Sequence, residues 1–210
     1  LRNLINDILI RDIAIRYSLK DVDSLKKLTA YLFTNTACPV SANQLTDLIG
    51  LKSASSILEY FSYLKNAYLV DFIPQFSYSL KKQLRNPKKV YAIDLGLVNV
   101  VASTFSDNAD RKLENLIFLH LREKNNEIYY FKDIGECDFV IKHEGKIIQA
   151  IQVCYKINDD NFSRELNGLI AALDAFDLEF GTIVTLNQKD ELNKNGKKIS
   201  LIPAYIFLQS

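Results

Sequence analysis

Residues 136–155 read ECDFVIKHEGKIIQAIQVCY, and this stretch decides the fold of the C-terminal half of the chain. Its apolar and β-branched residues gather in two runs, 139–142 and 147–155, which predict two strands. Glu144 and Gly145 lie between the runs and are typical of a tight hairpin turn. The stretch therefore predicts an antiparallel β-hairpin.

Polar residues occupy one part of this hairpin. Asp138 opens the first strand. Residues two apart on a strand point to the same side, so Gln152, Cys154 and Lys156 are expected to share one face of the second strand. Glu114 lies on an earlier predicted helix. These residues are the candidate chemical site.

The segments around the hairpin alternate between helical and strand patterns. A helix is predicted around 113–121 and another over 163–176, with strands at 128–131, 182–186 and 199–208. Pro203 is expected to break the last strand. The order predicts an α/β domain over residues 94–210, in which helices flank a mixed sheet.

The N-terminal half has a different pattern. Residues 1–18 show the spacing of an amphipathic helix, and three further helices are predicted at 25–33, after Ser41, and from Ser53 to about residue 67. The short turn 50–52 between the last two is typical of a helix-turn-helix. Strands expected at 68–73 and 90–93 would form a hairpin. These elements predict a winged helix over residues 20–93.

The loop between these two strands carries the most basic short segment of the chain. Lys81, Lys82, Arg85, Lys88 and Lys89 lie within nine residues that contain no acidic residue. Beside a helix-turn-helix, such a cluster favours contacts with nucleic-acid phosphates. An ordinary solvated hairpin is the alternative, and the sequence leaves both open.

Composition limits the remaining possibilities. The 210 residues carry a formal net charge of +1, so a nucleic-acid surface would have to be local. Three cysteines without metal-ligand spacing argue against a disulfide framework and favour a reducing cytoplasm. The sequence contains neither a signal peptide nor an apolar run long enough to span a membrane. It has no methionine and begins at Leu1, which we take as the sign of a fragment of a longer polypeptide.

Several strings together resemble a known family. VYAIDLGL at 90–97, LEN at 113–115, YY at 129–130, ECDFV at 136–140, IQVCY at 151–155 and REL at 164–166 are similar to the PD-(D/E)XK nucleases. They are more similar still to the domain of unknown function found after the ATPase module of many bacterial and archaeal AAA-type ATPases. The resemblance implies an α+β chain overall: residues 1–19 link to a preceding ATPase module, 20–93 form the winged helix, and 94–210 form a restriction-endonuclease-like domain.

The resemblance also implies site residues and partners. Asp138, Gln152 and Glu114 would hold Mg²⁺, a hard cation that prefers oxygen ligands. DNA and the chain's own ATPase module would be partners, no membrane is implied, and a homo-oligomer is left open. ATP would bind in the preceding module alone, because this sequence has no phosphate-binding loop.

Two residues depart from the pattern of cutting members of that family. Cys154 stands where those members have the catalytic lysine, and a thiol cannot supply a permanent positive charge. Gln152 keeps an oxygen ligand but removes a negative charge, which weakens attraction for a divalent cation. Lys156 is the candidate for a displaced lysine. The plainer alternative makes Asp138 a backbone-bonded strand residue, Glu114 a helix-cap partner and Cys154 a small buried hydrophobe.

Three functions follow as hypotheses. The first is a nucleic-acid-binding module whose nuclease-like site is degenerate and inactive. The second is an active Mg²⁺-dependent nuclease, with Glu114, Asp138, Gln152 and Lys156 as catalytic residues. The third is a protein-interaction or regulatory module of the ATPase. The two departures favour the first or third hypothesis, and the basic segment favours the first.

Overall fold

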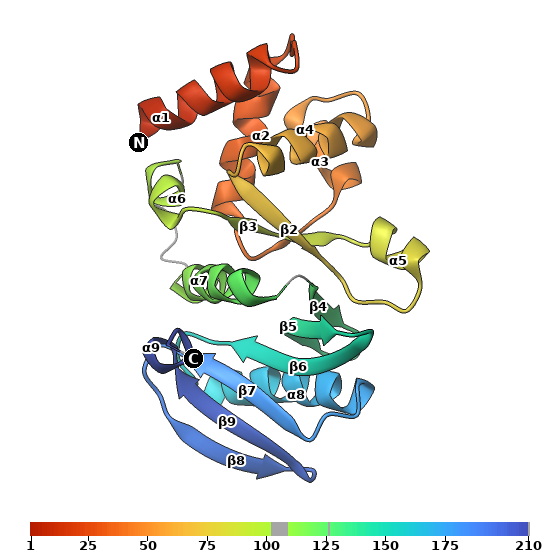
Figure 1. Cartoon of the computed structure of the whole chain (residues 1–210), viewed down its shortest axis with the longest axis vertical. Helices are drawn as coiled ribbons and strands as arrows, with labels where there is room; N and C mark the ends of the chain where they lie inside the picture. The colour runs from red at the N-terminus through yellow and green to blue at the C-terminus, as the bar shows by residue number, and fades with distance from the viewer. Residues whose placement is uncertain (102–108, 126, 210) are drawn as a thin grey trace. The chain divides into compact units, whose positions relative to one another are not determined.

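The computed structural model describes residues 1–101, 109–125 and 127–209 and shows an α+β protein with two sheets, of three and six strands (Figure 1). Its described residues fall into two compact units. The first unit comprises Leu1–Phe72 and residues 86–101, and the second comprises Ile73–Arg85 and residues 109–209. The chain therefore passes between the units three times.

The first unit is mainly helical. It contains α1 (Arg2–Asp7), the π-helix η1 (Ile8–Ile15), α2 (Val22–Thr34), α3 (Ala42–Ile49), α4 (Ala54–Asn66) and α6 (Leu95–Val101). A three-stranded sheet in the order β1-β3-β2 accompanies them, formed by β1 (Pro39–Val40), β3 (Lys88–Ala92) and β2 (Val70–Pro74). The last two residues of β2 belong to the second unit.

Local sequence explains where these helices begin and end. The Asp21 carboxylate accepts a hydrogen bond from the Ser24 N–H at the start of α2, and Ser53 does the same for the Ser56 N–H at the start of α4. Gly50 ends α3 with a φ of 82°, a left-handed conformation that favours glycine. The three predicted helices of this unit and the turn between α3 and α4 are confirmed.

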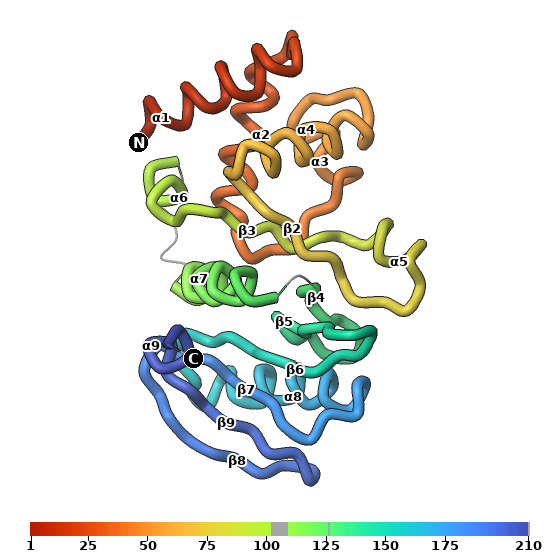
Figure 2. The backbone as a smooth tube through the Cα atoms, viewed as in Figure 1, coloured from red at the N-terminus to blue at the C-terminus, as the bar shows by residue number. Residues whose placement is uncertain are grey.

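The second unit is built on the six-stranded sheet, whose order is β4-β5-β6-β7-β9-β8. The tube in Figure 2 follows its antiparallel meander of β4, β5 and β6. Strands β7 and β9 continue the sheet parallel to β6, and β8 is antiparallel to β9. The bounds are β4 (Ile128–Lys132), β5 (Glu136–His143), β6 (Lys146–Val153), β7 (Phe180–Thr185), β8 (Asp190–Lys194) and β9 (Lys197–Pro203).

Helices flank this sheet, as the sequence predicts. Helix α7 (Ala109–Lys124) contacts β6, α8 (Asp159–Ala175) contacts β5, β6 and β7, and α9 (Ala204–Phe207) contacts β7 and β9. The remaining helix, α5 (Leu80–Arg85), lies between β2 and β3 in sequence. Pro203 ends β9, which confirms the predicted break in the last segment.

A close backbone contact joins α8 to β5. Gly168 of α8 lies against the backbone of Glu136, and a methyl group on Gly168 would lie 3.1 Å from the Glu136 carbonyl carbon and closer still to its oxygen. Gly135, which precedes β5, is also close to α8, since a methyl group on it would lie 3.0 Å from the Gly168 Cα. The absence of both side chains lets the helix approach the strand.

The structure differs from the sequence-based expectations in several elements. The helix expected over 1–18 changes at Ile8 from α to π geometry, in which backbone hydrogen bonds span five residues. The basic loop contains the short helix α5. Strand β6 ends at Val153, two residues before the predicted end, and among the described helices none is both long and apolar enough to cross a membrane.

Candidate functional site

Asp138 and Gln152 meet on neighbouring strands of the second unit. The Asp138 N–H donates to Gln152 Oε1 over 3.1 Å, and the Val153 N–H donates to Asp138 Oδ2 over 2.9 Å. Both side chains are buried, each with 6% of its surface exposed. The sequence prediction that these two residues come together is confirmed, and Asp138 is bonded to backbone as the plainer alternative expects.

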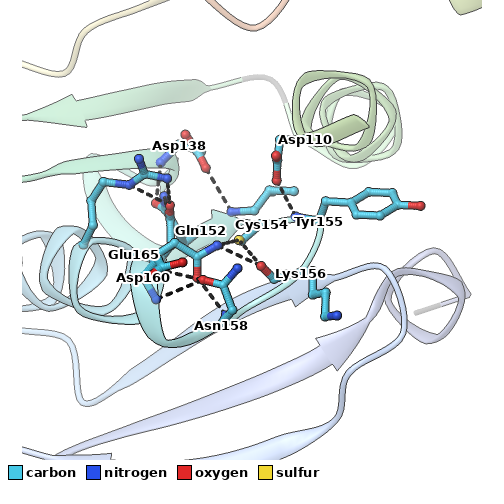
Figure 3. A network of polar contacts seen from close by, with 12 residues as sticks. Asp110, Asp138, Gln152, Cys154, Tyr155, Lys156, Asn158, Asp160 and Glu165 are labelled. Carbon is cyan, nitrogen blue, oxygen red and sulfur yellow. Dashed lines mark hydrogen bonds and ion pairs between the residues drawn. The ribbon is translucent and has the colours of Figure 1, made fainter. Parts of the chain in front are cut away.

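The other end of the Gln152 amide points to α8 (Figure 3). Gln152 Nε2 donates to Glu165 Oε2 over 2.6 Å, and Glu165 is itself buried. Arg164 Nε donates to the second carboxylate oxygen over 3.0 Å, and this contact raises the pKa of the Arg164 guanidinium. We call Asp138, Gln152, Arg164 and Glu165 the polar network. Both Oε1 and Nε2 of the Gln152 amide are hydrogen-bonded within this network.

Cys154 lies beside this network. Its thiol is buried, and burial first, then the negative charges of Glu165 and Asp110, raises the pKa of the Cys154 thiol to about 11. Cys154 Sγ donates to the Lys156 carbonyl at 3.4 Å, and Asn161 Nδ2 approaches the sulfur at 3.5 Å. A thiol in this environment stays protonated at neutral pH, so it supplies neither a nucleophile nor a positive charge.

Lys156 does not occupy the position that the strand periodicity predicts. Strand β6 has ended at Val153, and the segment that follows is held by a bond from the Tyr155 N–H to Asp110 Oδ1 at 2.7 Å. Lys156 is exposed, and its side chain points away from Asp138 and Gln152 in Figure 3. The rule that alternate residues share a face applies only while the strand continues, which is the reason for the difference.

Glu114 is the third predicted metal ligand. It lies on α7, with 9% of its surface exposed. Within the described ranges, no group of three or more His, Cys, Asp or Glu side chains is arranged to hold a metal ion. A site made of Glu114, Asp138 and Gln152 would have two carboxylates and an amide oxygen that already accepts the Asp138 N–H. Asp138 Oδ2 likewise accepts the Val153 N–H, so two of the predicted ligand oxygens are hydrogen-bonded to backbone.

The five residues predicted to contact phosphates lie in different environments. Lys81, Lys82 and Arg85 are exposed on α5, a helix without a buried residue. Lys88 is half-buried on β3, and Lys89 is buried there with 2% of its surface exposed. Lys89 therefore does not belong to the exposed basic surface, because its place in the central strand of the smaller sheet encloses it.

The sequence-based site lacks three residues that the structure brings to it. Glu165 and Arg164 come from α8, and Asp110 comes from the first turn of α7. The string Arg164-Glu165-Leu166 is one of those that resemble the family named above, and it could have pointed to α8 as part of the site. No spacing rule connects Asp110 to Tyr155, which lies 45 residues further along the chain.

Fold and site together define a class of protein: a two-unit α+β protein whose sheet-bearing unit holds a buried, internally bonded polar network. The model of a family described as a domain of unknown function, DUF8612, matches residues 1–108 of this chain. The chain belongs to that family. The match covers the described residues of the first unit and also Ile73–Arg85, the stretch that contains α5 and that we call the α5 segment.

Two relatives share sequence over most of the chain. An uncharacterized protein of Methanocaldococcus jannaschii, MJ1544, is 33% identical over 200 residues, which are 91% of this chain and 44% of that protein. An uncharacterized protein of Haemophilus influenzae is 26% identical over 165 residues, which are 76% of this chain and 41% of that protein. The chain therefore spans less than half the length of these archaeal and bacterial relatives.

Proposed function

We propose that the protein is a nucleic-acid-binding module, in which the α5 segment contacts the phosphates of duplex DNA. The observation that carries this proposal is the exposure of Lys81, Lys82 and Arg85 on one short helix. No acidic residue occurs between Asp71 and Asp94, so no neighbour in sequence neutralises these cations. Exposed cations without acidic neighbours suit a polyanionic backbone.

The order of elements supports the same function. Helix α2, β1, helices α3 and α4, and then β2 and β3 follow one another as in a winged helix, with a turn of helix-turn-helix type at Gly50. In such modules the second helix of the turn enters the major groove, and here that helix would be α4. In the order of elements, the segment between β2 and β3, which contains α5, takes the place of the wing.

We propose further that the second unit is a nuclease-like domain with a degenerate site. Its order of helix α7, meander β4–β6, helix α8 and parallel strand β7 supports this proposal, as does the position of Asp138 next to Gln152. The bonded state of Gln152 and the protonated thiol of Cys154 argue for a site that no longer cuts.

The first prediction tests DNA binding. Changing Lys81, Lys82 and Arg85 together to glutamine should weaken binding to duplex DNA and make it less dependent on salt. Each lost phosphate contact lowers the slope of log K against log salt by about 0.9, so three contacts lower it by about 2.7. Fluorescence anisotropy of a labelled duplex over a salt series measures both quantities.

A matched triple variant controls for the change in net charge. Lys146, Lys189 and Lys194 are exposed residues of the same unit, and changing them to glutamine removes the same number of charges. This variant should keep the slope of the wild type. Equal slopes for all three proteins would show that α5 does not contact DNA phosphates and would favour the protein-interaction hypothesis.

The second prediction tests catalysis. We expect no Mg²⁺- or Mn²⁺-dependent cleavage of plasmid DNA by the wild-type chain, since phosphodiester hydrolysis in this kind of site needs a metal and a nearby positive group. Asp138→Ala is the control that separates a contaminating nuclease from an intrinsic one. Cleavage by wild type that disappears in Asp138→Ala would establish the active-nuclease alternative.

A separate proposal concerns the part of the polypeptide outside this chain. We propose that the part outside this chain carries an AAA-type ATPase module, supported only by the resemblance and by the greater length of the two relatives. Reading the complete genes for a phosphate-binding loop tests this directly. Its absence would remove the ATPase from the proposal and leave the DNA-binding prediction unchanged.

A further inference from the structure

A hollow of about 210 Å³ opens within the first unit. Three tyrosines, an asparagine and two residues of opposite charge line it. They come from η1 and the turn after it, from the end of α4, and from the residues that follow α4. The lining side chains that matter here are Asp12, Arg16, Tyr17, Tyr63, Asn66 and Tyr68.

The two charged residues are available to a ligand. Asp12 and Arg16 both line the hollow, and both are exposed. Within the described chain neither of them makes an ion pair, with the other or with a third residue. The Arg16 guanidinium instead lies 5.8 Å from the centre of the Tyr17 ring. The hollow is thus lined by a carboxylate and a guanidinium that are not paired with each other.

The aromatic residues give the hollow a planar wall. The rings of Tyr17 and Tyr63 are stacked, with centroids 3.9 Å apart and an angle of 21° between their planes. Asn66 Nδ2 donates to the Tyr17 hydroxyl over 3.4 Å, which holds the outer edge of this pair. The stacked pair therefore forms part of the wall of the hollow.

Tyr68 lines the hollow just after the end of α4. Its φ is 54°, in the left-handed region that bulky residues rarely adopt, and 73% of its surface is exposed. Hydrophobic burial does not explain a large aromatic ring held there. This φ is the one that a helix end of this type requires, since the Leu69 N–H donates to the Leu64 carbonyl and the Tyr68 N–H to the Lys65 carbonyl. The cap leaves the ring exposed to a ligand, and Asp12 lies on the π-helix η1, a geometry frequent at functional sites.

We propose that this hollow binds one ribonucleotide unit. Its base would stack on Tyr68, a ribose hydroxyl would donate to the Asp12 carboxylate, and its phosphate would accept hydrogen bonds from Arg16. Aromatic rings stack on every base, acidic residues bind ribose hydroxyls, and guanidinium groups suit phosphate oxygens. A plain phosphate would leave Asp12 and Tyr68 without a role, and an apolar ligand would leave both charges unpaired.

The inference goes beyond the proposed DNA-binding function and does not depend on it. None of the lining residues belongs to the α5 segment or to the polar network, and Tyr63 and Asn66 lie in the last turn of α4. The same ribonucleotide unit can come from two sources, a free mononucleotide or the 5′-phosphorylated end of an RNA strand. Both present a base, a ribose and a phosphate.

The test uses the chain labelled with ¹⁵N and titrated with AMP, GMP, CMP and UMP, with chemical-shift changes as the readout. At least one mononucleotide should shift the amides of Asp12, Arg16 and Tyr68 and saturate. Arg16→Gln should weaken that binding about tenfold or more, because hydrogen bonds to charged groups contribute about 1.5–3 kcal/mol. Tyr68→Asn tests the stacking ring while keeping a residue that tolerates a positive φ.

Arg11→Gln is the matched control. Arg11 is an exposed arginine of the same π-helix that does not line the hollow, so its loss should change the affinity less than twofold. The 2′-deoxy form of the best mononucleotide should bind several-fold more weakly than the ribo form. A 5′-phosphorylated RNA tetramer, compared with the same tetramer without the phosphate, distinguishes a strand end from the free nucleotide.

The outcomes separate this inference from the proposed function. Saturable shifts around the hollow that Arg16→Gln weakens and Arg11→Gln does not would support the site, even if the α5 variant leaves DNA binding unchanged. Absence of shifts with every mononucleotide and with the phosphorylated tetramer would overturn it. An equal loss of mononucleotide affinity in Arg16→Gln and Arg11→Gln would also overturn the inference, because general charge attraction would then explain the binding.

Discussion

Gly168→Ala is expected to destabilise the second unit by about 3 kcal/mol. Alanine normally stabilises the interior of a helix by up to about 1 kcal/mol relative to glycine, so propensity alone predicts the opposite sign. Here the added methyl group would overlap the Glu136 carbonyl and force α8 away from β5. Overpacking of this kind typically costs about 1–3 kcal/mol, and displaced backbone lies at the upper end. Urea unfolding followed by circular dichroism measures the change.

Asn167→Ala is the control for this experiment. Asn167 precedes Gly168 on the same helix, but its side chain is exposed. Its replacement should leave the free energy of unfolding within about 0.5 kcal/mol of the wild type. If Gly168→Ala were as stable as Asn167→Ala, α8 and β5 would not be in the close contact described above.

Glu165→Ala should have an effect of similar size on the free energy of unfolding. It removes the acceptor of the Gln152 amide and leaves that buried N–H group without a partner, which costs about 1–3 kcal/mol. The small cavity left by the side chain adds to this loss. The total should be near 3 kcal/mol in the same urea experiment.

Glu165→Gln separates the two roles of this side chain. Glutamine keeps a carbonyl oxygen that can accept from Gln152, while it loses the charge that faces Arg164. Because the Arg164 side chain is 79% exposed, its ion pair contributes little, and the variant should lose less than about 1 kcal/mol. Equal losses for the alanine and glutamine variants would show that the charge, and not the hydrogen bond, is what matters.

Much of the fold could be predicted from local patterns, because capping residues and apolar periodicity act over a few positions. Ser53 marks the start of α4 and Gly50 the end of α3, and both helices occur where they are expected. Helix α5 could not be predicted in this way, since it buries no residue and therefore has no apolar face. The change from α to π geometry at Ile8 has no signal in the residue types of the first helix.

The candidate site was predictable only in part. The hairpin fixes which residues of β5 and β6 are neighbours, so the proximity of Asp138 and Gln152 follows from sequence. The partner of Gln152 depends on how α8 packs across the sheet, and Glu165 is 13 residues away from it. Lys156 was misplaced because the predicted strand extended beyond Val153, where the chain turns away. Packing between elements, and not local pattern, decides such contacts.

The three passages of the chain between its units limit how the protein can be dissected. Because Ile73–Arg85 belongs to the second unit while the residues on both sides of it belong to the first, one cut cannot yield two complete halves. A gene fragment ending at Phe72 would omit β3 and α6, and one beginning at residue 109 would omit α5. Exchange of either unit with a homologue by a single recombination joint would therefore produce chimeras with mismatched parts. Units linked in this way are expected to be inherited together.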